Sequence, residues 1–132
     1  MVLLIVRVRH VHHATRKIGN GLVAEQDGVI VGIAHYLFRP STWAVKDFCY
    51  LEDLFVKPEF RGSGLGLELM KTLAQVCVDR SYERFQWWVL DWNEPSINFY
   101  KSIGAEAMDE WTVYRLSGSA LKSFAASSTS NR

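Results

Sequence analysis

Hydrophobic and polar positions in the first half of the chain predict short strands. Two hydrophobic runs, Leu22–Glu25 and Val29–Phe38, flank the pair Asp27-Gly28, which supplies the positive φ angles of a tight hairpin turn. Phe48–Val56 is mostly hydrophobic and is interrupted only by two acids. That pattern is typical of a strand in the middle of a sheet.

The pattern changes in the second half, where helical spacing alternates with short hydrophobic runs. Gly64–Arg80 carries leucines at helical spacing and predicts an amphipathic helix, and Glu94–Ile103 predicts a shorter one. Arg84–Leu90 and Trp111–Leu116 are predicted as strands. Strands that alternate with helices indicate an α/β fold with a mixed, partly parallel sheet.

The ends of the chain differ from this middle part. Residues 1–20 begin with a β-branched run, then lose any clear period, and hold four basic residues and no acid. Residues 117–132 are rich in serine and are expected to fray. We therefore expect an atypical basic segment over residues 1–20, the folded domain over 21–116, and a tail over 117–132.

Composition narrows the class of protein. The 132 residues are 48% hydrophobic and 22% charged, with a formal net charge of +1, which gives no reason to expect nucleic acid as a partner. The hydrophobic start is too short for a membrane span. Cys49 and Cys77 are too few for a disulfide framework. We expect two buried thiols, no membrane association and a cytoplasmic location.

The sharpest motif lies between a predicted strand and a predicted helix. Its residues are Arg61, Gly62, Ser63, Gly64, Leu65 and Gly66. The glycines let the backbone approach a ligand, and the helix start behind them offers free N–H groups and the positive end of a dipole. Such a loop suits a pyrophosphate.

Two other pyrophosphate motifs do not fit this loop. A dinucleotide fingerprint needs its third glycine one residue later, where Leu67 stands. A P-loop needs a lysine directly after the glycines, and the first lysine is Lys71. A glycine-rich turn without a ligand remains the structural alternative.

At this point the chain resembles the GNAT superfamily of N-acetyltransferases. Arg61–Gly66 matches its Q/R-x-x-G-x-G/A motif, and YLEDLFV (Tyr50–Val56) and WNEPSINFYK (Trp92–Lys101) are similar to its spermidine/spermine and thialysine branch. The resemblance implies a GNAT-type sheet with flanking helices, acetyl-CoA as co-substrate, an amine acceptor and a homodimer. It also implies a strand-helix-helix segment before the hairpin, which is shortened or missing here.

Glu52 and Asp53 are the candidate acids of the predicted central strand. An alkylamine is mostly protonated at neutral pH, so acetyl transfer needs a base to remove that proton. We assign this role to Glu52, while Asp53 adds negative charge for a cationic substrate, although strand alternation should turn Asp53 to the other face. Solvated acids at an edge or bulge are the alternative interpretation.

The remaining site residues serve the thioester and the acceptor. Backbone N–H groups of Leu54, Phe55 and Val56 would stabilise the oxyanion if the strand splays open there. The resemblance makes Tyr100 the proton donor to the departing thiolate and places Asn93 and Ser96 along the CoA arm. Packing beside Phe99 is the alternative role of Tyr100.

Aromatic and histidine clusters carry weaker signals. Trp87, Trp88 and Trp92 are expected mainly in the core and at a dimer surface. The resemblance makes Trp87 and Trp88 candidates to touch the acceptor. His10, His12 and His13 lack ligand spacing on a defined element, so no metal is expected.

Two functions follow from these observations. The first is an enzyme that moves the acetyl group of acetyl-CoA to a primary amine of a small diamine, polyamine or lysine-like molecule. The second is a non-catalytic acetyl-CoA-binding or interaction protein that has lost the N-terminal wall of the acceptor site. The presence of both Glu52 and Tyr100 favours the first.

Overall fold

The protein contains one five-stranded mixed sheet, ordered β1-β2-β3-β4-β5. A computed structural model describes residues 7–12, 20–40 and 47–128. Its internal contacts divide the chain into two compact units, Met1–Leu90 and Asp91–Arg132. The sheet and the glycine loop belong to the first unit, and the two units are described separately below.

The predicted hairpin is confirmed. β2 (Asn20–Gln26) and β3 (Val29–Arg39) are antiparallel, and Asp27 and Gly28 between them have φ angles of 51° and 79°. Positive φ at both central residues gives the turn a twist that matches the strands.

A further strand precedes the hairpin. β1 (Arg7–His12) pairs antiparallel with β2, so residues 10–12 are regular, although their sequence shows no period. Pairing with an existing strand stabilises such a segment without a local pattern. The expected shortening of the strand-helix-helix segment is confirmed, because residues 13–19 alone join β1 to β2.

The parallel pair of the sheet is built around the longest helix. β4 (Phe48–Val56) has the predicted bounds and pairs antiparallel with β3. The short helix η1 (Pro58–Phe60), the glycine loop and α1 (Leu65–Asp79) follow. The chain then returns as β5 (Phe85–Trp87), parallel to β4.

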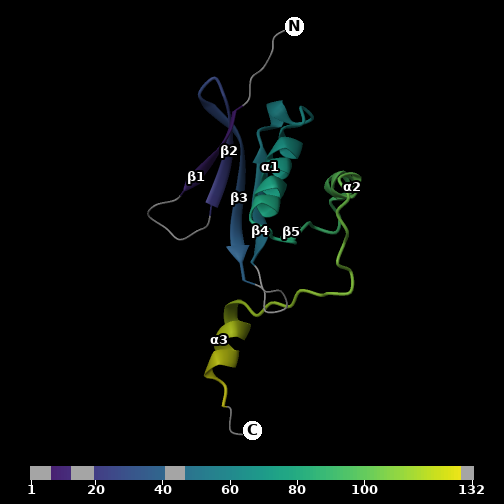
Figure 1. Ribbon diagram of the computed structural model, residues 1–132. Helices are drawn as coiled ribbons and strands as arrows, with labels where there is room; N and C mark the ends of the chain where they lie inside the picture. The colour runs from purple at the N-terminus through teal and green to yellow at the C-terminus, as the bar shows by residue number, and fades with distance from the viewer. Residues whose placement is uncertain (1–6, 13–19, 41–46, 129–132) are drawn as a thin grey trace. The chain divides into compact units, whose positions relative to one another are not determined.

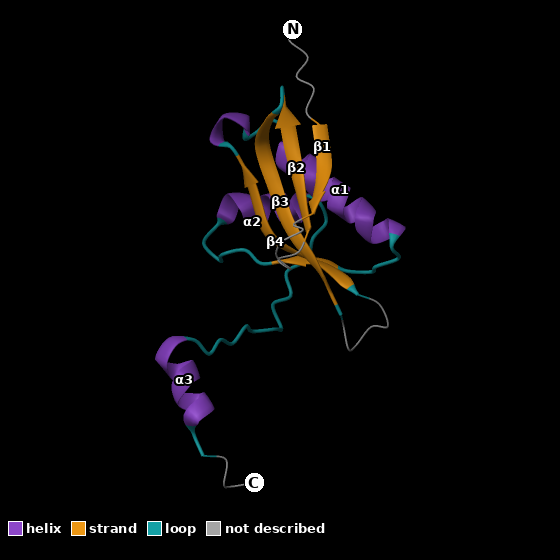
Figure 2. Cartoon of the chain, turned by 90° about the vertical axis from the view of Figure 1, so that its left-hand side faces the viewer, coloured by secondary structure: helices purple, strands orange, loops and turns teal. Residues whose placement is uncertain are grey.

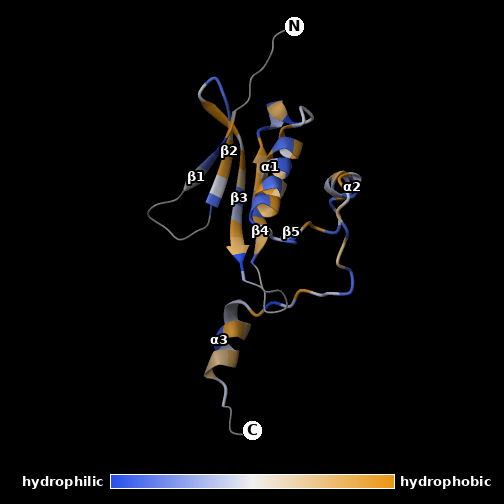
Figure 3. Ribbon diagram, viewed as in Figure 1, coloured by the Kyte–Doolittle hydropathy of each residue, from blue (hydrophilic) through white to orange (hydrophobic). Residues whose placement is uncertain are grey.

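One face of the sheet packs against α1 (Figures 1 and 2). Gly32 of β3 sits under this helix, where an added Cβ would lie 3.4 Å from the side chains of Leu65 and Leu69. Along α1 the buried residues are Leu65, Leu69, Met70, Leu73 and Cys77. Hydrophobic and hydrophilic residues alternate along α1 in Figure 3, as expected for a helix with one buried side.

The other face of the sheet, called the far face below, is defined by strand alternation. Gly32, Ala34 and Tyr36 are buried on the α1 side. Their neighbours on β3 therefore point away from α1, and the β4 residues paired with those neighbours share that face. The far face is formed by Ile33, His35, Leu37, Arg39, Phe48, Tyr50, Asp53 and Phe55.

The second unit holds two helices, α2 (Glu94–Ser102) and α3 (Gly118–Ala126). α2 is confirmed, with Gly104 after its end at a φ of 92°. The predicted strand over Trp111–Leu116 is wrong, because these described residues have no strand partner. The predicted frayed tail over 117–132 instead includes α3, whose alanine, leucine and lysine residues are good helix formers.

The described helices contain none that is long and hydrophobic enough to cross a bilayer.

Candidate active site

The glycine loop forms an open turn into α1. Gly62 and Gly64 have φ angles of 81° and 87°, a region that side chains other than glycine rarely adopt. A Cβ added at Gly62, Gly64 or Gly66 would meet no atom of the described residues within 4 Å, apart from the adjoining chain. The described part of the protein therefore leaves space beside the loop at all three glycines.

The start of α1 leaves backbone donors unpaired within the helix. Its N-cap is Gly64, which provides no side-chain cap, and the first bond is donated by Glu68 to the Gly64 carbonyl. The amides of Leu65, Gly66 and Leu67 precede that bond and have no intrahelical acceptor. Together with the helix dipole, they form a site for an anion.

Two side chains of the loop hold it against neighbouring backbone. Nε of Arg61 donates to the carbonyl oxygen of Val56 at 2.9 Å, and its guanidinium lies over the Phe55 ring, 5.5 Å from the centroid. The Ser63 hydroxyl donates to the Phe60 carbonyl. These side chains were predicted as cofactor ligands, and the structure shows them bonded to the loop's own surroundings.

β4 and β5 diverge halfway along β4. β5 has three residues and pairs with Cys49, Tyr50 and Leu51, so the predicted strand Arg84–Leu90 is too long. Beyond Leu51 the described β4 has no neighbour on the β5 side. Leu54, Phe55 and Val56 lie in this stretch, which is paired with β3 but not with β5 and directly precedes η1 and the glycine loop.

A β-bulge interrupts β4 where it leaves β5. Leu51 pairs with Tyr36 and Asp53 with His35, so Glu52 is the extra residue on β4. A bulge breaks strict alternation and redirects side chains. Glu52 and Asp53 are both exposed, and the expectation that they point to opposite faces does not hold across the bulge.

Both acids influence the pKa of Tyr50. Burial raises the pKa of the Tyr50 phenol, the carboxylates of Glu52 and Asp53 raise it further, and Arg39 opposes them. Asp53 also lies near His35, with Oδ2 3.8 Å from Nδ1. Two carboxylates and one guanidinium thus act on Tyr50 electrostatically, in opposite directions.

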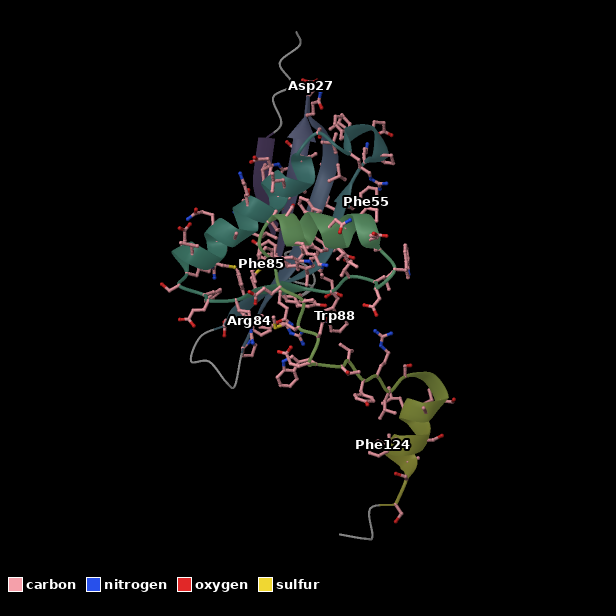
Figure 4. The ribbon with its side chains drawn as sticks, turned by 90° about the vertical axis from the view of Figure 1, so that its right-hand side faces the viewer. Asp27, Phe55, Arg84, Phe85, Trp88 and Phe124 are labelled. Atoms are coloured by element: carbon pink, nitrogen blue, oxygen red, sulfur yellow. The ribbon has the colours of Figure 1, made fainter. Side chains whose placement is uncertain are left out.

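The two predicted acceptor tryptophans lie on different faces. Trp88 is 55% exposed and meets Tyr50 edge-on at 5.8 Å between ring centroids. Trp87 pairs with Leu51 on the α1 side and stacks with Phe85. Trp88 therefore lies on the far face with Tyr50; in Figure 4 it lies towards the opposite end of β4 from Phe55.

In the second unit, the predicted residues lie on α2 or at its start. Asn93 is the N-cap, and its Oδ1 accepts from the Ser96 amide at 3.4 Å, so both residues have a structural role. Tyr100 is half-buried and packs against Phe99 at 5.6 Å. Burial raises the pKa of Tyr100 above its ordinary value, which keeps the phenol protonated and able to donate.

A family comparison covers most of this architecture. Residues 7–105 match the model of the acetyltransferase (GNAT) family. The chain belongs to the GNAT family. This match includes the sheet, the glycine loop and α2, so the fold and the motif of the GNAT family are both present.

Curated relatives of this GNAT chain are amine acyltransferases by name. It is 39% identical over 103 residues to thialysine N-epsilon-acetyltransferase of Sus scrofa. The aligned residues cover 76% of this chain and 60% of that relative. L-ornithine N5-acetyltransferase NATA1 of Arabidopsis thaliana is 34% identical over 96 residues, covering 73% and 42%. The chain thus spans about 60% of the length of the thialysine enzyme.

Solved structures agree with the GNAT assignment. An integron cassette protein from V. cholerae superposes with a TM-score of 0.77 at 33% identity, covering 82% of this chain and 67% of that one. An aminoglycoside N-acetyltransferase in complex with CoA gives 0.65 at 21% identity, covering 77% and 69%. The second likeness concerns the fold alone.

The structure adds site residues that sequence reasoning missed. Arg39 lies over the Tyr50 ring, and His35 lies opposite Asp53. These residues become neighbours only because β3 pairs with β4, and a bulge shifts the register of that pairing by one residue. No contiguous motif in the sequence marks them as a group. No metal was expected at His10, His12 and His13, and His13 lies outside the described residues.

Proposed function

We propose that this chain transfers the acetyl group of acetyl-CoA to a primary amine of a small diamine, polyamine or lysine-like acceptor. One observation carries the proposal. β4 leaves β5 at Leu51, immediately before the bulged Glu52, and then runs to the glycine loop paired with β3 but not with β5. Free backbone donors, a carboxylate and an anion site therefore follow one another along a single strand and its exit.

Each part of this strand suits one part of the substrates. The pyrophosphate of CoA binds the amides at the start of α1, beside Gly62 to Gly66. The pantetheine arm runs along the unpaired edge of β4. The thioester oxygen then lies near the amides of Leu54–Val56, which stabilise the charge that develops on it.

The chemical step needs two proton transfers. Glu52 takes the proton from the acceptor's ammonium group, directly or through water, and the neutral amine attacks the thioester carbon. The tetrahedral intermediate collapses with cleavage of the carbon–sulfur bond. Tyr100 gives its proton to the departing CoA thiolate, and Asn93 and Ser96 help to position the CoA arm at the start of α2.

The names of the relatives support a small acceptor. Thialysine and ornithine are amino acids with a terminal amine, and a spermidine/spermine acetyltransferase-like protein of Homo sapiens is 35% identical over 88 residues, covering 64% of this chain and 12% of that relative. The acids Glu52 and Asp53 beside Trp88 suit a cationic acceptor of this size. We further propose a cytoplasmic homodimer that uses no metal and binds neither nucleic acid nor membranes.

The test is release of free CoA thiol by the purified protein, with a panel of amines at saturating acetyl-CoA. We expect turnover with short diamines or lysine-like amines and little with long polyamines or histone peptides. Equilibrium dialysis with acetyl-CoA accompanies the assay. Tight acetyl-CoA binding without turnover of any amine would refute the enzyme and favour the non-catalytic binding protein.

A further inference from the structure

Arg39 is the cation of the far face that lies against the Tyr50 ring. Arg39 ends β3, is exposed, and holds its guanidinium carbon 5.1 Å from the centroid of the Tyr50 ring. We propose that Arg39 binds the carboxylate of an amino-acid acceptor whose terminal amine reacts near Glu52. This inference rests on the proposed acetyltransferase function, and it selects a basic amino acid over a diamine.

The charges around Tyr50 have both signs. Glu52 and Asp53 lie on the loop side of Tyr50 along β4, and Arg39 lies over its ring. All three influence the Tyr50 phenol electrostatically, the acids in one direction and Arg39 in the other. A molecule that bridges them should therefore carry an ammonium group at one end and a carboxylate at the other.

The spacing of these groups suits a short aliphatic chain. Tyr50 and Glu52 are two positions apart on β4, and two residues of a strand span roughly 6.7 Å. Arg39 marks the Tyr50 end of this interval. Both residues belong to the same strand across the bulge, and a lysine or ornithine side chain separates its charged ends by a comparable length.

The guanidinium is arranged to receive a carboxylate. Stacking on an aromatic ring fixes the plane of an arginine and leaves the N–H groups at its edge free to form a bidentate pair. Within the described residues, Arg39 forms no ion pair with an acid of the chain. A second ammonium group, as in a diamine, would instead meet a like charge here.

An aromatic surface connects the two charged ends. The Tyr50 and Trp88 rings meet edge-on, and Trp88 remains half exposed. Methylene groups of an acceptor pack favourably on such rings. Arg39, Tyr50 and Trp88 therefore discriminate between acceptors, while the reaction itself takes place at the acids and the thioester.

The experiment compares each amino acid with the diamine that lacks its carboxylate. Initial rates are measured for lysine against cadaverine and for ornithine against putrescine, with wild type, Arg39→Gln and Arg39→Lys. Arg80→Gln is the control, because Arg80 stacks on Phe38 at 4.2 Å on the α1 side. Melting temperatures of all variants establish that they fold.

We expect wild type to favour the amino acids. Arg39→Gln should lower kcat/KM for lysine and ornithine by roughly 10- to 100-fold, mainly through KM, and leave the diamines unchanged or improved. Arg39→Lys should recover part of the loss, and Arg80→Gln should resemble wild type. Equal effects on both acceptor classes, or a wild-type preference for diamines, would overturn the role of Arg39 but leave the proposed acetyltransferase function standing. No turnover of any amine would overturn the proposed function with it.

Discussion

Arg61 ties the glycine loop to the end of β4 by donating from Nε to the carbonyl oxygen of Val56, 2.9 Å away. Its guanidinium also rests on the Phe55 ring, so the same side chain holds two consecutive residues of the strand. These contacts link the loop to the stretch of β4 that has no β5 neighbour. They therefore connect the proposed pyrophosphate site to the proposed oxyanion site.

Replacing Gly64 with valine should abolish acetyl-CoA binding. The φ angle of 87° at Gly64 is unfavourable for any side chain, and the new methyl groups would fill the open space beside the loop. We also expect a loss of about 1–3 kcal/mol in the free energy of unfolding from the strained backbone. Calorimetric titration with CoA and a denaturant melt measure the two effects.

Gly28→Val is the matched control for that change. Gly28 also has a positive φ angle, of 79°, and a Cβ there would meet no atom of the described residues within 4 Å. It lies in the turn between β2 and β3, so this variant should carry a similar backbone strain and keep its CoA affinity. An unchanged affinity in Gly64→Val would refute the placement of the pyrophosphate.

Glu52→Gln should slow acetyl transfer most at neutral pH. The acceptor amine has a pKa of about 10.4 when unperturbed, so free amine forms without help only at alkaline pH. The deficit in kcat/KM should therefore shrink between about pH 7 and pH 10. Glu59→Gln, which neutralises an exposed acid of η1, should follow wild type; a Glu52→Gln profile parallel to wild type would exclude Glu52 as the base.

Tyr100→Phe should fold normally and turn over roughly 10²-fold more slowly or worse. Burial raises the pKa of Tyr100 above the ordinary value for tyrosine, so the donor keeps its proton as the pH rises through about 10. The wild-type rate should show no loss of this donor below that pH. Tyr114→Phe removes a hydroxyl from a side chain that is 92% exposed and should have no effect; equal rates for both variants would make Tyr100 a packing residue.

The two thiols should differ in reactivity in the folded protein. Cys49 and Cys77 are both buried, between β4 and α1. A hydrogen bond between them raises the pKa of Cys49, and burial raises it further, whereas the same bond lowers the pKa of Cys77. Iodoacetamide should therefore label Cys77 before Cys49, as followed by peptide mass spectrometry, and both at similar rates in urea. Earlier labelling of Cys49 would contradict this assignment of the hydrogen bond.

Local signals explain which elements the sequence predicts well. The Asp27-Gly28 turn, α1 and α2 depend on residues close together in the chain, namely turn glycines, caps and helical spacing. A hydrophobic strand pattern needs a partner as well. Trp111–Leu116 has the pattern but no partner in the described chain, and α3 forms where serine content alone suggested fraying.

The same distinction between local signals and strand pairing applies to the candidate site. Arg61–Gly66, Glu52 and Tyr100 are recognisable because each belongs to a contiguous motif. Arg39 and Trp88 meet Tyr50 only through strand pairing, and the bulge at Glu52 alters that pairing by one residue. The positions that would discriminate between acceptors are therefore set by register, which a single sequence does not reveal.

The uncapped start of α1 would link the stability of the protein to the concentration of acetyl-CoA. Gly64 leaves the first amides of the helix without side-chain acceptors, and a bound phosphate would complete the helix in their place. A ligand that binds only the folded state stabilises it by about 2.7 kcal/mol at a hundred times its Kd. The melting temperature should thus rise with acetyl-CoA concentration, and in a cell the abundance of this protein would follow the level of the thioester.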